Sequence, residues 1–214
     1  MSEEFELSEL ELAALVSSRI CHDVISPVGA IANGLEVLAD EADEVMREHA
    51  LDLIRKSAQQ ASAKLQFARL AFGAAGSAGA EIDLRDAEKV ARGILDGSKH
   101  TIEWSGPVAN LPKDKVKLLL NMVTIGLTTL PRGGAISVAI AGEAEDTAFV
   151  VHCRGEHSRL PEDVPQLLAG GNGRTIDAHS IQPYYAGRIA AAAGMSLEAV
   201  AEDDGVVLKA RPSG

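Results

Sequence analysis

The sequence predicts an α+β fold, in which an N-terminal helical hairpin that forms a four-helix bundle by dimerisation is followed by an α/β sandwich. Three observations support this prediction. They are a heptad repeat of apolar and small residues in the first third of the chain, a stretch of Gly, Ala and Ser at residues 73–79, and alternating helix and strand patterns after it. A chain of 214 residues is long enough for two small domains. We therefore expect domains at residues 1–75 and 80–214.

The first two helices are predicted from apolar and small residues spaced alternately four and three apart. One stripe runs from Leu10 to Leu38, and a second runs from Ala50 to Phe72 after an acidic break at residues 40–43. Helices of this length form an antiparallel hairpin, but two helices alone cannot cover both stripes. Pairing with a second copy into a four-helix bundle covers them, so we expect a homodimer.

Residues 80–214 carry shorter elements. We expect helices at 83–95 (N-capped by Asp83), 112–129, 161–168 and 180–193, with a glycine-rich loop at 170–173. We expect strands at 101–105, 135–141, 148–153, 196–201 and 206–210. Asp204-Gly205 is a strong hairpin signal between the last two strands. This order favours helices packed on one face of a mixed sheet.

Composition excludes several classes of function. The net charge of −11 argues against binding to nucleic acid or to an anionic membrane, because both need a basic surface. The longest apolar run, residues 118–130, is too short to span a bilayer, and the acidic N-terminus does not resemble a signal peptide. Cys21 and Cys153 are too few for a disulfide framework. We therefore expect a cytoplasmic protein with neither nucleic acid nor membrane as a partner.

The sharpest local feature is the run CHDVISP at residues 21–27. In the heptad register His22 lies beside the seam and points towards solvent, Asp23 neighbours it and Ser26 lies one turn on. Pro27 cannot donate the backbone bond that the Asp23 carbonyl would otherwise accept, which loosens the helix there. A neutral imidazole can attack a phosphoryl group while an adjacent carboxylate holds the proton on the other nitrogen. These four are the candidate site residues, although an ordinary exposed histidine beside a kinking proline fits the motif equally well.

This run resembles the phosphorylation box of sensor histidine kinases, which has a His, an acid, and a Pro five residues after the His. His22, Asp23 and Pro27 match it, while Ser26 stands where those kinases usually carry Thr or Asn. The later order of elements resembles their ATP-binding domain, so the resemblance covers nearly the whole chain. It implies that residues 1–75 form the dimerisation and histidine-phosphotransfer domain.

The nucleotide-binding motifs of those kinases are not matched. Asn121 fits the first of two Asn four residues apart, but the second position is Ile125, which cannot ligate a hard cation. We therefore expect Asn121 to be a polar residue satisfied within the domain. The glycine motifs for adenine and phosphate are absent, and residues 180–185 occupy the place of the second. The resemblance implies a degenerate domain that neither binds ATP nor holds a cofactor or metal.

These features together identify the chain as a member of the ChpT-type histidine phosphotransferases, with residues 19–31 as its most specific stretch. The resemblance implies that His22 accepts a phosphoryl group from the receiver Asp of a hybrid histidine kinase. His22 then passes it to response regulators, of which CtrA-like and CpdR-like proteins are the expected kinds, with Mg²⁺ supplied by the receiver. Ile25 and Val28 are candidate partner contacts, although for Val28 a place in the bundle core is preferred.

Three other interpretations remain open at this point. A working histidine kinase with a divergent ATP site keeps His22 and Asn121, and predicts nucleotide binding. A non-catalytic dimeric module that only occupies a receiver predicts that His22→Ala leaves partner binding intact. A zinc site formed by His152, Cys153 and His157 lacks a fourth ligand at an evident spacing.

Overall fold

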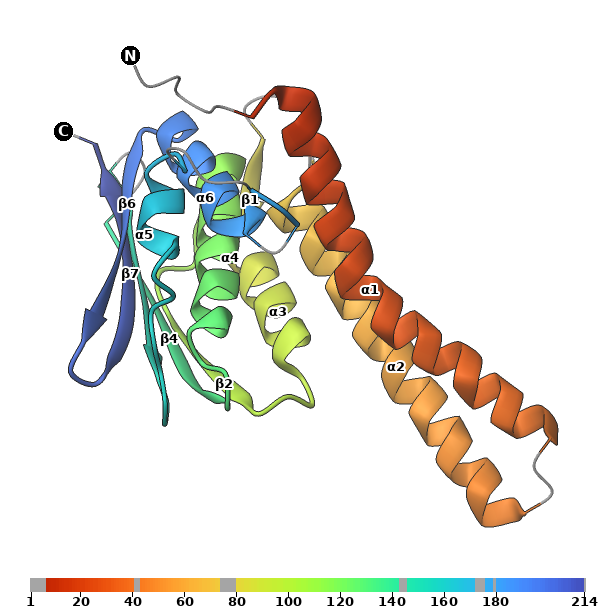
Figure 1. Cartoon of the computed structure of the whole chain (residues 1–214). Coiled ribbons are helices and arrows are strands. Elements are labelled where there is room, and N and C mark those ends of the chain that lie inside the picture. Colours follow the sequence, from red (N-terminus) through yellow and green to blue (C-terminus); the bar gives the residue numbers. More distant parts are fainter. Residues whose placement is uncertain are drawn as a thin grey trace.

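The computed structural model describes residues 7–40, 43–73, 80–142, 146–171, 176–178 and 180–213. A long helical hairpin projects from an α/β sandwich, and the base of the hairpin packs against the helices of that sandwich (Figure 1). Parts of the predicted acidic break, glycine-rich loop and small-residue linker (residues 41–42, 172–173 and 74–79) lie outside the described residues.

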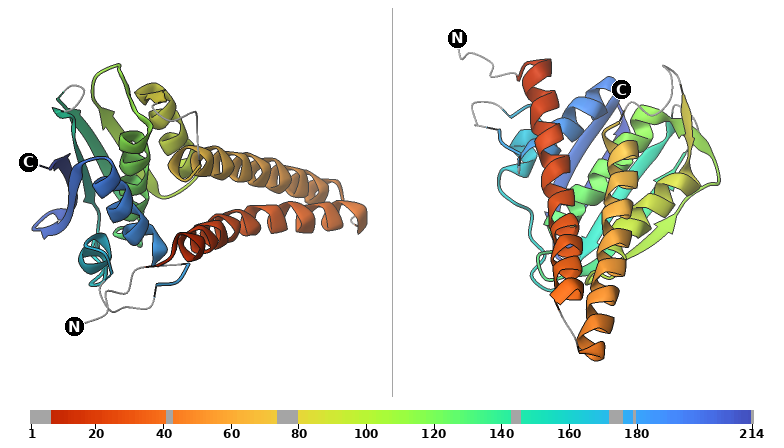
Figure 2. Two further views of the ribbon diagram at one scale, coloured as in Figure 1. Left: turned by 90° about the horizontal axis from the view of Figure 1, so that it is seen from above. Right: turned by 90° about the vertical axis from the view of Figure 1, so that its right-hand side faces the viewer.

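The hairpin consists of α1 (Glu9–Asp40) and α2 (Glu44–Ala71), which lie side by side and antiparallel (Figures 1 and 2). Asp43 caps α2 by accepting hydrogen bonds from the N–H groups of Val45 and Met46, which satisfies two donors that the helix leaves unpaired. Gly34 lets the two helices approach closely. A Cβ at this position would lie 2.6 Å from Ile54 Cγ1, so the seam accepts only hydrogen there.

The seam between the two helices lies one residue away from the predicted stripes at several positions. In α1 it contains the buried Pro27 and Gly34, while the predicted Val28 and Leu35 are 49% and 54% exposed. In α2 the predicted Ala50, Ile54, Ala61 and Ala68 are buried or half-buried, but residues 57 and 64 take the places predicted for 58 and 65. The prediction was wrong at these positions because it followed apolar residues, whereas the seam takes Ser57 and Lys64. The predicted stripe of α1 is instead exposed over much of its length.

The sandwich has a five-stranded mixed sheet with strand order β2-β4-β5-β7-β6, in which β2 and β4 are parallel and the other pairs antiparallel. Its strands are β2 (His100–Ser105), β4 (Gly134–Ala141), β5 (Ala148–Arg154), β6 (Met195–Glu202) and β7 (Gly205–Pro212). The helices are α3 (Leu84–Leu95), α4 (Lys113–Thr128), α5 (Val164–Leu168) and α6 (Ile181–Ala192). They cover one face of the sheet, as predicted (Figure 2).

Two short elements escaped prediction, and one helix is shorter than expected. β1 (Glu81–Asp83) and β3 (Asn110–Pro112) form a two-stranded sheet of three residues each, too short for an alternating pattern. The helix expected at 161–168 begins only at Val164. The N-cap of α3 is Asp83, whose carboxylate accepts a hydrogen bond from the Arg85 N–H, which confirms the predicted cap.

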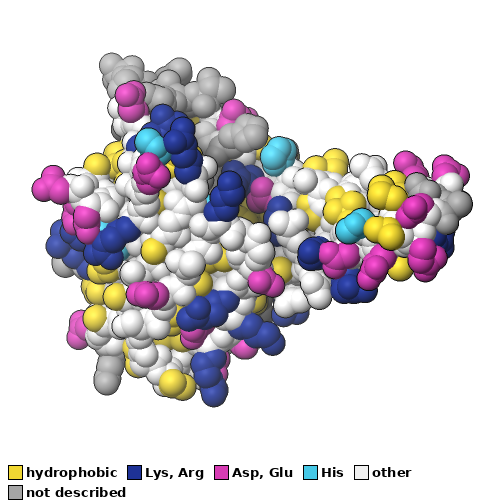
Figure 3. All heavy atoms as spheres, turned by 90° about the horizontal axis from the view of Figure 1, so that it is seen from below, with side chains coloured by type: hydrophobic (Ala, Val, Ile, Leu, Met, Phe, Trp, Pro, Cys, Tyr) yellow, Lys and Arg dark blue, Asp and Glu magenta, His cyan; other side chains and the backbone are white. Residues whose placement is uncertain are grey.

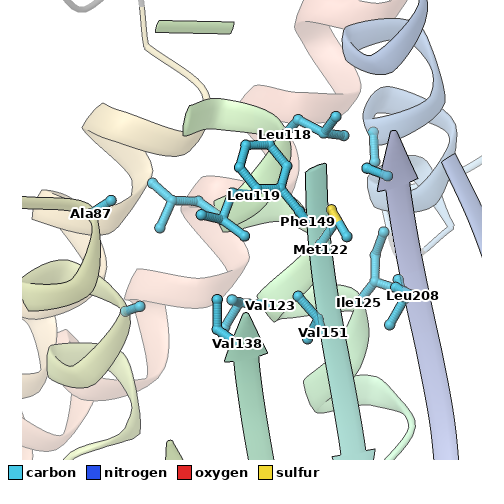
Figure 4. Packing of buried hydrophobic residues seen from close by; sticks show 14 of the residues in the cluster. Ala87, Leu118, Leu119, Met122, Val123, Ile125, Val138, Phe149, Val151 and Leu208 are labelled. Carbon is cyan, nitrogen blue, oxygen red and sulfur yellow. The ribbon is translucent and has the colours of Figure 1, made fainter. Parts of the chain in front are cut away.

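The core forms around α4, which packs against the sheet on one side and against α2, α3 and α6 on the others. Leu119, Met122 and Val123 of this helix meet Phe149 and other inward-facing side chains of the strands (Figure 4). Phe67, Leu70 and Ala71 at the end of α2 belong to the same buried cluster. Burying each large side chain contributes about 1.5–3 kcal/mol, so the base of the hairpin is held firmly on the sandwich.

A smaller apolar cluster holds the beginning of α1. Leu7, Tyr184 and Ile181 are buried together, with Leu12 and Val16 packed against them. Both hairpin helices are thus anchored to the sandwich at the same end. In the part of the chain that the structure describes, no helix combines the length and apolar character needed to cross a membrane.

Two glycines in helices test this packing. A Cβ at Gly187 in α6 would overlap the Leu168 carbonyl oxygen of α5, whereas a Cβ at Gly93 in α3 would lie 3.6 Å from the Ala63 Cβ, an ordinary contact. Gly187→Ala is expected to lower the free energy of unfolding by about 1–3 kcal/mol, because the helices must separate. Gly93→Ala is expected to raise it by about 0.5–1 kcal/mol through helix propensity. Urea denaturation followed by circular dichroism measures both, and stabilisation by Gly187→Ala would contradict this packing.

Candidate active site

His22 lies in the first half of α1, the half whose start packs against the sandwich. Its side chain is 64% exposed, and Nδ1 lies 3.8 Å from Oδ1 of Asp23. The prediction that His22 points towards solvent is confirmed. Since a histidine nitrogen that reacts with another protein must be reachable, this position suits a nucleophile better than a structural role.

Asp23 is held from the preceding turn of the helix. Its Oδ2 accepts a hydrogen bond from Arg19 Nε at 3.1 Å, while Oδ1 faces His22. Exposed ion pairs of this spacing contribute only about 0.3–0.5 kcal/mol to stability. The pair therefore matters more for orientation: with Arg19 fixing one oxygen, the other stays beside the imidazole.

Pro27 leaves the Asp23 carbonyl without its helical donor, as predicted, and the structure supplies another. Lys64 Nζ of α2 donates a hydrogen bond of 2.8 Å to that carbonyl oxygen. Sequence reasoning missed Lys64 because it placed Leu65 in the seam. The signal that could have revealed it is a lysine at a heptad seam position of α2, opposite a proline that leaves a carbonyl unpaired.

The other candidate residues lie on the exposed surface around His22. Ser26 is exposed one turn further along α1, and Ile25 is 69% exposed. At spacings of three and four residues, His22, Ile25 and Ser26 share one face of the helix. The structure therefore brings His22 and Asp23 together and surrounds them with an accessible surface that includes Ile25 and Val28.

A cavity of about 280 Å³ opens beside Asp23, where the hairpin meets the sandwich. Its polar lining includes Arg19, Asp23 and Lys64, and its apolar lining includes Phe67, Phe72 and Leu127. The backbone that carries His22 thus forms one wall of the junction between the hairpin and the sandwich. A shift of α1 against the sandwich would therefore move the histidine.

Asn121, which matches the first Asn of the kinase nucleotide motif, forms hydrogen bonds within the protein. Asn121 is fully buried, and its Nδ2 donates to the carbonyl oxygens of Ala71 at 3.1 Å and Lys117 at 2.9 Å. Gln182 Nε2 donates to Thr124 Oγ1 and, at 3.5 Å, to Asn121 Oδ1. The expectation that Asn121 is satisfied within the protein is confirmed.

Comparison with known proteins decides the family. A profile of the histidine phosphotransferase C-terminal domain matches residues 84–205. The chain belongs to the histidine phosphotransferase family. The phosphotransferase is 50% identical over 206 residues to the protein phosphotransferase ChpT of Brucella abortus, covering 95% of this chain and 97% of that protein.

A solved structure of a bacterial phosphotransferase superimposes on the chain with a TM-score of 0.89 at 45% identity, covering 97% of this chain and 99% of that chain. A histidine kinase domain from Erythrobacter litoralis superimposes with a TM-score of 0.47 at 14% identity, covering 87% and 95%. The relative from Brucella abortus and the solved bacterial phosphotransferase confirm the predicted family and the predicted class of enzyme, a protein phosphotransferase.

The zinc hypothesis is wrong for this phosphotransferase. His152 and Cys153 are neighbours in β5 and point to opposite faces of the sheet, and His157 Nε2 instead accepts a hydrogen bond from Arg132 Nη1. Within the described ranges, the one cluster with possible metal ligands is His152, Glu202 and Asp204. Its carboxylates are already paired, because Arg154 Nε donates to Asp204 at 2.7 Å and Lys209 Nζ to Glu202 at 3.1 Å.

Burial raises the pKa of the Cys153 thiol, and a hydrogen bond with Thr129 lowers it by a smaller amount. The net result is a pKa of about 11. At pH 8 only about one such thiol in a thousand is then the reactive thiolate. We expect Cys153 in a Cys21→Ser variant of the phosphotransferase to resist iodoacetamide at pH 8 while folded and to react fully in 6 M guanidinium. Mass spectrometry of the alkylated protein measures both. Rapid labelling of the folded variant would contradict the burial of Cys153.

Proposed function

We propose that His22 carries the phosphoryl group in this phosphotransferase. It accepts the group from the receiver Asp of a hybrid histidine kinase and donates it to the receiver Asp of response regulators, with CtrA-like and CpdR-like regulators as the expected recipients. The observation that carries the proposal is the exposed imidazole of His22 beside a carboxylate that Arg19 holds in place.

The transfer follows from the two side chains. Asp23 Oδ1 stabilises the proton on Nδ1, which leaves the lone pair of Nε2 to attack the phosphorus of the aspartyl phosphate. A nitrogen–phosphorus bond forms as the oxygen–phosphorus bond breaks, and the released electron pair stays on the receiver carboxylate. Donation to the next receiver is the reverse of this step. Asp23 thereby orients the ring and stabilises its positive charge during transfer.

Mg²⁺ is expected from the receiver rather than from this chain. Beside His22 the acidic group is Asp23, which already accepts a hydrogen bond from Arg19 and lies next to Lys64. Such a positively charged setting does not suit a divalent cation, which prefers several free oxygen ligands. Because the chain has a net charge of −11, apolar contacts to Ile25 and Val28 are better suited than bulk charge to hold an acidic receiver.

We infer that ATP is not the phosphoryl donor. A cavity of about 140 Å³ lies beside Ile125, the residue at the second Asn position of the kinase motif. Its lining also includes Thr128, Pro161, Asp163 and Gln182. Pockets for small ligands usually measure about 300–1,000 Å³. Asn121 and Gln182 are also engaged with the protein, as described above. A cavity of this size is smaller than the usual pocket for a nucleoside triphosphate, which supports a relay over the alternative of an active kinase.

We infer that the phosphotransferase works as a homodimer in the cytoplasm. Apolar side chains that the hairpin does not cover lie along both helices, including Leu10, Leu35, Val45, Leu51 and Leu65 (Figure 3). A second hairpin would bury them in a four-helix bundle. The free thiols of Cys21 and Cys153 agree with a reducing compartment.

A transfer assay tests the relay. Radiolabelled phospho-receiver freed of ATP is expected to label the wild-type chain but not His22→Gln, and labelled ATP alone is expected to label neither. Asp23→Asn is expected to slow labelling about 100-fold or more, because an amide neither holds the Nδ1 proton nor stabilises the positive charge of the ring as a carboxylate does. Label from ATP alone would show an active kinase. Stable receiver binding without label would show a non-catalytic module.

The dimer is tested by placing a charge on its proposed interface. Leu35→Glu, on the exposed stripe of α1, is expected to convert a dimer into a monomer, because the new carboxylate would be buried without a partner. Val108→Glu, also at an exposed apolar position but in the sandwich, is the control and is expected to leave the dimer intact. Sedimentation equilibrium measures the mass, and a monomeric wild-type chain would refute the dimer.

A further inference from the structure

Lys64 occupies a position where a charged residue is unexpected. It is half-buried in the seam between α1 and α2. Along α2 the seam residues around it are Ser57, Ala61 and Ala68, spaced alternately four and three apart. Lysine is rarely buried at such places unless its ammonium group has a partner. The partner here is the backbone of α1 at the level of His22.

The interaction completes a hydrogen bond that proline removes. In an ordinary helix the N–H of residue 27 would donate to the carbonyl of residue 23, but Pro27 has no N–H. Lys64 Nζ lies 2.8 Å from the Asp23 carbonyl oxygen and donates to it from the other helix. Pro27 is itself buried in the seam between the two helices.

Asp23 is consequently held at two points. Lys64 binds its backbone carbonyl and Arg19 binds its carboxylate, while His22 is the preceding residue in the chain. A freed carbonyl beside a proline normally permits the helix to bend. The bond from Lys64 opposes that bend at the residue whose Oδ1 faces the imidazole.

We propose that Lys64 is a positioning residue for phosphoryl transfer, an inference that rests on the proposed role of His22. It replaces the hydrogen bond that Pro27 cannot make, and so keeps Asp23 Oδ1 beside Nδ1 of His22 while the phosphoryl group arrives and leaves. Its positive charge also partly offsets the negative charge that a phosphoryl group brings to this acidic protein. Since it acts through Asp23, losing it changes the rate of transfer more than the binding of the receiver.

The test measures single-turnover transfer from a radiolabelled phospho-receiver to the full chain by rapid quench. Lys64→Met is expected to lower the maximal rate constant about 10–100-fold, the scale of a small misplacement of reacting groups. The receiver concentration that gives half the maximal rate is expected to stay within about twofold of wild type. Lys64→Arg is expected to recover most of the rate, because it retains charge and donors. Lys56→Met is the matched control on the same helix, since Lys56 is exposed and pairs with Asp52.

A double substitution separates the backbone contact from general effects of losing a lysine. Pro27→Ala restores an N–H that can donate to the Asp23 carbonyl, so it is expected to make Lys64 less necessary. Pro27→Ala/Lys64→Met is therefore expected to transfer faster than Lys64→Met alone. Circular dichroism and thermal unfolding confirm that each variant is folded.

The outcomes distinguish this inference from the proposed function. Label on His22→Gln would refute the role of His22. Label on wild type at His22 with an unchanged rate for Lys64→Met would refute the role of Lys64 alone. So would a defect that neither Lys64→Arg nor Pro27→Ala relieves, or a loss confined to receiver binding.

Discussion

The packing of the end of α2 against α4 is the contact on which the rest of the structure depends. Phe67, Leu70 and Ala71 are buried in the main core, and Asn121 of α4 binds the Ala71 carbonyl at the point where α2 ends. An unpaired carbonyl buried at a helix end would cost about 1–3 kcal/mol, so this hydrogen bond favours ending the helix there. It also fixes the direction in which the hairpin leaves the sandwich, and therefore the position of His22.

The same contact gives a structural role to Asn121, the residue that matches the first Asn of the kinase motif. In the kinases that the sequence resembles, an Asn at the position of Asn121 faces phosphate and magnesium. In this chain Asn121 holds the hairpin, and Gln182 contacts both Asn121 and Thr124. These polar residues join two parts of the protein. The sandwich thus acts as the support on which the hairpin stands.

The sequence predicts the long elements well because their periodicity extends over many residues, and α1, α2, α4 and the main sheet appear close to the expected bounds. The three-residue strands β1 and β3 carry no such pattern and depend on tertiary pairing. His22, Asp23 and Pro27 were found because their spacing is local. Lys64 was not found, because its role arises from a contact across 41 residues and because Leu65 beside it fits an apolar stripe better.

A histidine proposed to carry a phosphoryl group must be open to a partner and must also be held firmly. Two opposite faces of α1 meet these two requirements. The outward face carries His22, Ile25 and Val28, which a receiver can reach. The inward face carries Pro27, which would weaken the helix if its freed carbonyl stayed unpaired. Because Lys64 donates to that carbonyl from the side of α2, α1 gains rigidity while the side chain of His22 stays largely exposed. An ordinary helical residue at position 27 would give the same bond locally, but it would not tie α1 to α2 at the height of the histidine. The proline therefore makes the geometry of the site depend on the second helix, which is itself anchored in the core through Ala71 and Asn121.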